Sequence, residues 1–186
     1  MKEKQLLTTR NLVACAMIAA LYTALCTTTA PISYGPLQVR IAEALTLLPV
    51  FSPFLIWGVT LGCALSNLVG FMTGADILGY MDIPFGTAAT FLAAVLTYKL
   101  RGVRFGKIPV LSALPPVLVN ALVIGLELTW LESGGFVPGI FLFNAFYVGL
   151  GQTIACFALG LPLVRVLERT GVAGRYLTGA GQPQGL

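Results

Sequence analysis

Six apolar runs, nearly free of charged residues, constrain the fold of this chain more than any other feature. They cover roughly residues 11–30, 41–53, 54–72, 83–100, 108–131 and 139–166. A helix that crosses the hydrocarbon core of a bilayer needs about 20 mostly apolar residues, and all but the second run approach or exceed that length. Only 10% of the residues are charged, against about 25% in an ordinary soluble domain. The sequence therefore predicts an all-α integral membrane protein, a six-helix bundle forming one domain over residues 1–186, with a flexible tail over 167–186.

The basic residues predict how these helices are oriented. Ten of the eleven fall before the first helix, between the fourth and fifth, or after the sixth: Lys2, Lys4, Arg10, Lys99, Arg101, Arg104, Lys107, Arg165, Arg169 and Arg175. With six crossings all of them lie on one side, which the positive-inside rule assigns to the cytoplasm. We therefore expect both termini in the cytoplasm and a first helix that is retained, not cleaved as a signal peptide. The pI near 9.0 follows from this asymmetry and does not indicate a nucleic-acid-binding surface.

Arg40 is the one basic residue that this topology places outside. It lies in the segment YGPLQVRIAEAL, three positions before Glu43, and on a helix two such side chains can form an ion pair. Such a pair would simply fix a loop in place. Alternatively, an outward-facing cavity needs a charged lid, and the sequence leaves both interpretations open.

Polar side chains inside the apolar runs are the candidate binding residues, because ionisable groups at membrane depth are costly and usually face a cavity or a partner. Glu127 is the clearest, and it shares a helical face with Asn120. The predicted set is Arg40, Glu43, Asn67, Asp82, Asn120, Glu127, Trp130, Asn144, Tyr147 and Gln152. Together they suit a flat, polar heterocycle, since aromatic rings stack and amides and carboxylates meet N–H and C=O groups. Each also has a structural explanation: amides link helices, and tryptophan anchors the membrane interface.

A stripe of small residues marks the first helix. Ala16, Ala20 and Ala24 recur at every fourth position, and such a stripe lets another helix approach closely. The neighbour is either a helix of the same chain or a partner protein.

The sequence offers no enzymatic or metal-binding motif. Histidine is absent and the four cysteines are scattered, so we expect no metal and no cofactor. The segment GVRFGK, residues 102–107, is too short for a phosphate-binding loop and lacks the following Ser or Thr. We expect no enzymatic activity, and any ATP hydrolysis would be carried out by partner subunits.

Four segments resemble the queuosine-precursor transporter family: APISYGPLQVRIAEALTLLPVF, DIPFGTAATFLAAVLTYKLR, LPPVLVNALVIGLEL and VGLGQTIACFALGLPL. The likeness runs in the same order over residues 12–167. Members of this family are substrate-binding S components of energy-coupling factor transporters. The resemblance implies six membrane helices, both termini in the cytoplasm, and a place in the cell membrane of a prokaryote.

The resemblance also implies partners and a ligand. The partners are a transmembrane coupling subunit and two ATPase subunits, with the stripe at Ala16, Ala20 and Ala24 as the docking surface. The segment 31–42 would close over the substrate, with Arg40 and Glu43 as part of this lid and its hinge. The ligand would be a 7-deazaguanine, such as a queuosine precursor, queuine or the nucleoside, and Glu127 could accept the donors of its guanine-like edge. Two alternatives remain open: a secondary transporter or channel that works alone, and a structural membrane subunit without a ligand.

Overall fold

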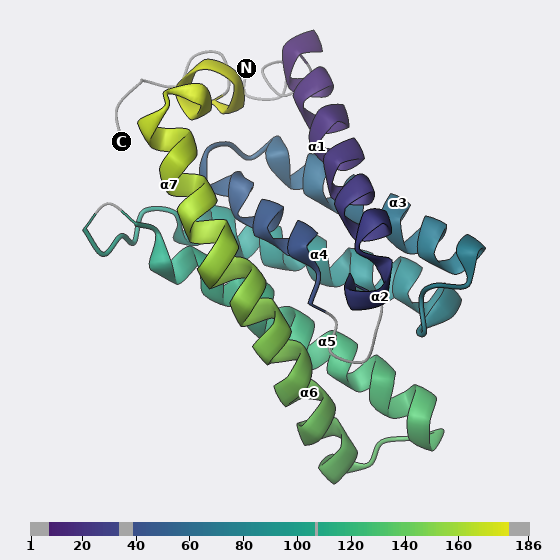
Figure 1. The fold of residues 1–186 in the computed structure, drawn as a ribbon. Helices are drawn as coiled ribbons and strands as arrows, with labels where there is room; N and C mark the ends of the chain where they lie inside the picture. Colours follow the sequence, from purple (N-terminus) through teal and green to yellow (C-terminus); the bar gives the residue numbers. More distant parts are fainter. Residues whose placement is uncertain (1–7, 34–38, 107, 179–186) are drawn as a thin grey trace.

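The computed structural model describes residues 8–33, 39–106 and 108–178, and within these ranges the chain forms helices and no strands (Figure 1). The elements are α1 (Thr9–Thr28), α2 (Ala30–Ser33), η2 (Ile41–Val50), α3 (Leu55–Thr73), η3 (Gly79–Met81), α4 (Asp82–Leu100), η4 (Val110–Ala113), α5 (Leu114–Ser133), α6 (Pro138–Thr153), η5 (Ile154–Gly160), α7 (Leu161–Arg169) and η6 (Ala173–Leu177).

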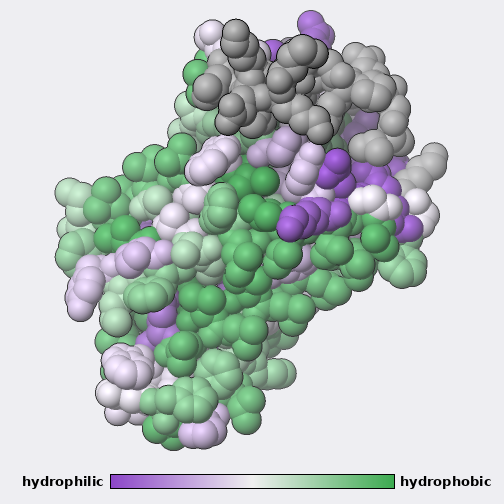
Figure 2. Space-filling model, turned by 180° about the vertical axis from the view of Figure 1, so that it is seen from behind, coloured by the Kyte–Doolittle hydropathy of each residue, from purple (hydrophilic) through white to green (hydrophobic). Residues whose placement is uncertain are grey.

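Within the described ranges, five helical stretches are long and apolar enough to cross a membrane. They are Thr9–Thr28, Leu55–Thr73, Gly79–Leu100, Val110–Ser133 and Pro138–Arg169, the last being α6, η5 and α7 in one continuous run. Apolar side chains cover most of the face drawn in Figure 2, and hydrophilic residues gather mainly toward its upper end. The prediction of an all-α membrane bundle is confirmed.

The second predicted helix differs from the other five. η2 has 10 residues in a 3₁₀ conformation, which at about 2 Å per residue is near 20 Å long, against a hydrocarbon core of about 30 Å. The prolines of this segment, Pro49 and Pro53, limit its length because each lacks an N–H donor. Nine of its ten residues, from Ala42 to Val50, are buried among the other helices. It is therefore a short internal helix and not a span of its own.

α1 and α3 pack closely and in parallel. Gly58 lies against Cys15, and Gly62, one turn later, lies against Tyr22, where a Cβ would come within 2.6 Å of the tyrosine Cβ. Only glycine permits this approach. Because the two helices run in the same direction, the segment with η2 returns the chain to the end where α1 begins.

The alanine stripe takes no part in this contact. The buried face of α1 carries Cys15, Ile18, Ala19, Tyr22 and Cys26. Ala16, Ala20 and Ala24 are exposed on another face. Internal packing therefore does not account for the stripe.

The basic groups predicted for one side of the membrane come together at one end of the bundle. Arg10, at the start of α1, donates to the backbone carbonyl of Arg175. Arg104, between α4 and α5, pairs with Glu168 of α7 at 2.9 Å. η6 belongs to the segment predicted as a flexible tail, and its Ala173 packs against the core; residues 179–186 are outside the described part. The side on which this end lies stays a prediction.

Candidate ligand-binding site

Arg40 lies at the centre of a polar cluster in the otherwise apolar bundle. It precedes η2 and is 3% exposed. Its guanidinium pairs with Asp82 at the start of α4 and donates to Asn67 Oδ1 of α3 at 3.1 Å and to the Ser33 carbonyl at 3.2 Å. Asn67 in turn donates to the Asp82 carbonyl at 2.7 Å. Glu43, the neighbour with which the sequence allowed a pair, is not the acid that pairs with Arg40: that acid is Asp82, 42 residues away.

These bonds fix the residues on either side of positions 34–38 in the predicted lid. Residues 34–38 of the 31–42 segment lie outside the described part of the chain. Ser33 and Arg40, on either side of them, are joined by the hydrogen bond just given. Removing one partner of a buried ion pair costs about 3–5 kcal/mol, because the other charge stays buried without compensation. The pair of Arg40 and Asp82 therefore holds the end of this segment to α4.

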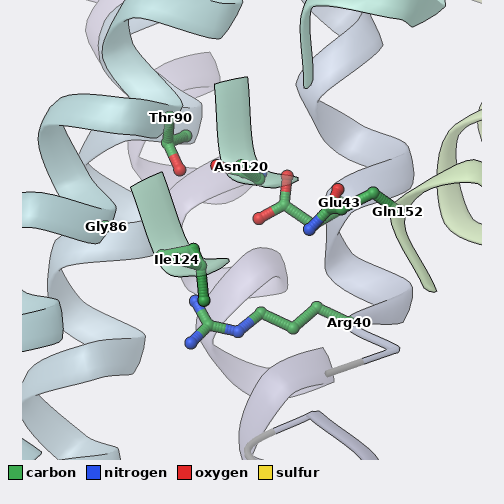
Figure 3. Close-up of a pocket in the computed structure, with 7 residues that line it drawn as sticks. All are labelled: Arg40, Glu43, Gly86, Thr90, Asn120, Ile124 and Gln152. Atoms are coloured by element: carbon green, nitrogen blue, oxygen red, sulfur yellow. The ribbon is translucent and has the colours of Figure 1, made fainter. Parts of the chain in front are cut away.

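A pocket adjoins this cluster, between η2, α4, α5 and α6 (Figure 3). Its lining residues are Arg40, Glu43, Gly86, Thr90, Asn120, Ile124 and Gln152. Their side chains fill the space closely enough that no water-sized sphere fits inside. A ligand therefore enters only when these side chains move apart.

Glu43 supplies the carboxylate of this pocket. Its side chain is 1% exposed, and Tyr22 of α1 donates its hydroxyl to Oε1 at 2.6 Å. The second oxygen, Oε2, has no hydrogen-bond partner. Because buried polar atoms in native structures are nearly always paired, this oxygen indicates a place where a ligand donor fits. Figure 3 places the Glu43 carboxylate beside the Gln152 amide, with the Arg40 guanidinium below them in that view.

Glu127 does not line the pocket but lies just beyond it. Ile124, which does line it, is one turn earlier on α5. Glu127 is 7% exposed, and neither of its carboxylate oxygens has a partner. The sequence favoured Glu127 for the guanine-like edge of a ligand, but the carboxylate that lines the pocket is that of Glu43.

Asp76, in the turn after α3, is a further buried acid, and the charged group of the cluster that affects it most is Asp82. Its Oδ1 accepts from the Leu78 N–H at 3.0 Å, and its Oδ2 has no partner. Burial, followed by the negative charge of Asp82, raises the pKa of Asp76 to about 7. Carboxylates that share a site raise each other's pKa in this way.

Three predicted residues lie away from the pocket. Trp130 is 52% exposed on the outer surface of α5. Tyr147 packs against Phe143, with ring centroids 4.5 Å apart. Asn144 donates to Glu132 Oε2 at 3.3 Å, which links α6 to the end of α5. The structure thus brings Arg40, Glu43, Asn67, Asp82, Asn120 and Gln152 together with the pocket and leaves these three outside it.

Sequence reasoning missed several members of the site. Gly86 is one turn after Asp82, whose carboxylate occupies the space that a Cβ at Gly86 would take. Thr90 is one turn further, and its hydroxyl donates to the Cys63 sulfur at 3.2 Å. Both share the helical face of Asp82, which is the signal that would have found them. Tyr22 gave no such signal, because an isolated tyrosine in an apolar helix looks like an ordinary core residue.

These observations define a multi-pass membrane protein with a buried polar pocket. The family model described as QueT transporter matches residues 12–169, and the chain belongs to this family. The resemblance predicted from the sequence is thereby confirmed.

A relative supports the same assignment. A "Queuosine precursor transporter QueT" from Lactococcus lactis subsp. cremoris (strain MG1363) is 40% identical over 72 residues. The match covers 38% of this chain and 42% of that protein, less than half of either. No solved structure matches the chain.

Proposed function

We propose that this chain is the substrate-binding S component of an energy-coupling factor importer in the cell membrane of a prokaryote. It captures a queuosine precursor or a related 7-deazaguanine outside the cell for ATP-driven uptake. The observation that carries this proposal is the pocket at Glu43, a small polar site enclosed in an apolar bundle. The family match and the printed name of the relative support the choice of ligand.

The pocket chemistry suits one edge of a 7-deazaguanine. This edge presents an N1–H and a 2-amino group side by side, and a carboxylate can accept from both. Glu43 has a free oxygen for this purpose, while the amides of Asn120 and Gln152 can meet the ring carbonyl and nitrogen atoms. A hydrogen bond to a charged group contributes about 1.5–3 kcal/mol, so two such bonds contribute about 3–6 kcal/mol, and burial of the ring must supply the rest of a micromolar affinity, about 8 kcal/mol.

The partners follow from two features of the chain. It has no nucleotide-binding motif of its own, so the proposed ATP-driven uptake needs ATPase subunits. The exposed stripe at Ala16, Ala20 and Ala24 offers the close approach that docking of a transmembrane coupling subunit requires. We place that subunit on this face of α1.

Uptake of a labelled 7-deazaguanine by bacterial cells tests the proposal. The cells lack their own importer, and three sets are compared. The first expresses this chain with the coupling subunit and both ATPases, the second is the same set with inactive ATPases, and the third expresses this chain alone. We expect uptake only with the complete, active set. Uptake by the chain alone would instead establish the secondary transporter or channel.

The pocket is tested in the same cells with Glu43→Gln, which keeps the shape but places an amide donor before the ligand N–H groups. Glu132→Gln, at the exposed end of α5, is the matched control. Uptake should fall at least about tenfold for the first variant, since each 1.4 kcal/mol is a factor of ten, and stay unchanged for the second. Equal uptake by both variants would remove Glu43 from the site.

A further inference from the structure

The charges buried near the pocket do not balance. Among the described residues, the buried acids are Glu43, Asp76, Asp82 and Glu127, and the buried base is Arg40. Arg40 pairs with Asp82, which leaves three acids without a basic partner in the described part of the chain. Burying a charge is very costly unless it is compensated. The site therefore needs protons or a cation from outside the described chain.

The oxygens that lack partners lie on the same acids. They are Glu43 Oε2, Asp76 Oδ2, Asp82 Oδ1, Glu127 Oε1 and Glu127 Oε2. All four side chains are more than nine-tenths buried. Glu127 is the extreme case, because both of its oxygens are unpaired while it faces the protein interior. An unpaired buried carboxylate requires a specific explanation, and a bound donor provides one.

The positions of these acids divide the site into two parts. Glu43 lines the pocket itself. Glu127 lies one turn beyond Ile124, about 4.5 Å further along α5 toward its C-terminal end. Asn120, Ile124 and Glu127 recur at i, i+4 and i+7, so Glu127 shares the face of α5 that lines the pocket. A substituent that extends from the ring along this face toward the end of α5 would reach Glu127.

We infer that the ligand carries a protonated amine, and that Glu127 binds this cation while Glu43, Asn120 and Gln152 hold the ring. Asp76, whose Oδ2 is unpaired, adds to the negative field at the amine, while Arg40 compensates the charge of Asp82. This inference rests on the proposed function and narrows it, since it selects 7-deazaguanines with an amine on the 7-substituent over those with a neutral group such as a nitrile.

Calorimetry on the full chain, purified in detergent at neutral pH, separates these ligands. The probes are 7-aminomethyl-7-deazaguanine and 7-cyano-7-deazaguanine, which share the ring and differ in charge. We expect the amine to bind at least about tenfold tighter, as one charge-assisted hydrogen bond predicts. Equal affinities would overturn the inference and leave the proposed function intact. Failure of both to bind would overturn both proposals.

Two variants locate the cation site. Glu127→Gln keeps the shape of the side chain and removes its charge, so the affinity for the amine should fall at least about tenfold and that for the nitrile by less than about twofold. Asp76→Asn should give the same selective loss to a smaller extent. Glu132→Gln is the control and should change neither affinity. Equal weakening of both ligands by Glu127→Gln would overturn the inference, because the residue would then support the ring or the fold.

Discussion

Replacing Gly86 with alanine should disrupt the site while adding a single methyl group. A Cβ at this position would overlap Asp82 Oδ1, and it would lie 2.9 Å from the Asp82 Cγ and 3.0 Å from the Asn67 Nδ2. The Asp82 carboxylate must then turn away, although it is fully buried and paired with Arg40. Overpacking of this kind costs about 1–3 kcal/mol, and separating the ion pair adds to that loss.

The magnitude can be followed by thermal unfolding of the purified protein. A loss of about 1–3 kcal/mol corresponds to a fall in Tm of about 2–4 °C per kcal/mol for a chain of this size. We therefore expect Gly86→Ala to lower the Tm by at least about 2 °C. Because Gly86 lines the pocket, the substitution should also weaken binding of the 7-deazaguanine at least about tenfold.

Gly139→Ala provides the matched control. Gly139 also lies in a helix, but a Cβ there meets nothing within 4 Å. Alanine favours a helix over glycine by up to about 1 kcal/mol, so the Tm should stay the same or rise. A Gly86→Ala protein with the Tm and affinity of the unchanged chain would refute the arrangement of Asp82 and Arg40 described above.

Three other changes test separate parts of the molecule. Tyr22→Phe removes the donor to Glu43 Oε1 and should lower the free energy of unfolding by about 1–3 kcal/mol; an unchanged denaturation midpoint would argue against this bond. Ala20→Trp should prevent co-purification with the coupling subunit yet leave ligand affinity unaltered, and intact assembly would exclude this face as the docking surface. Asp76 has a pKa raised to about 7, so the stability from its protonation is lost as pH rises from about 4 to about 7. Asp76→Asn should therefore flatten the fall in Tm between about pH 4 and pH 7, and an unaltered slope would show that another group is responsible.

The sequence predicted the spanning helices well, because each is a local apolar run. α3, expected at 54–72, is found at Leu55–Thr73, and the helix expected at 83–100 is α4 at Asp82–Leu100. The length of η2 was harder to predict, since its apolar residues are buried by other helices and not by lipid. A short apolar run has the same composition in both environments.

The partners of the site residues lay beyond the reach of the sequence. Arg40 has Glu43 three positions away, and local spacing favours that pair. The structure instead brings Asp82 to Arg40 from the start of α4, because the packing of α3 against α4 decides which acid is nearest. Likewise, the sequence favoured Glu127 as the acceptor, and only the fold shows that Glu43 lines the pocket with residues of α4, α5 and α6.

The central claim is that the pocket at η2 binds the ring of a 7-deazaguanine. A structure of the protein with saturating 7-aminomethyl-7-deazaguanine tests this claim most directly. The account predicts a bicyclic ring bounded by Glu43, Asn120 and Gln152, with its amine toward Glu127 and the lining side chains moved apart. A ring bound on the outer surface of α5 and α6, for example against Trp130 and Tyr147, with the pocket still closed, would contradict it.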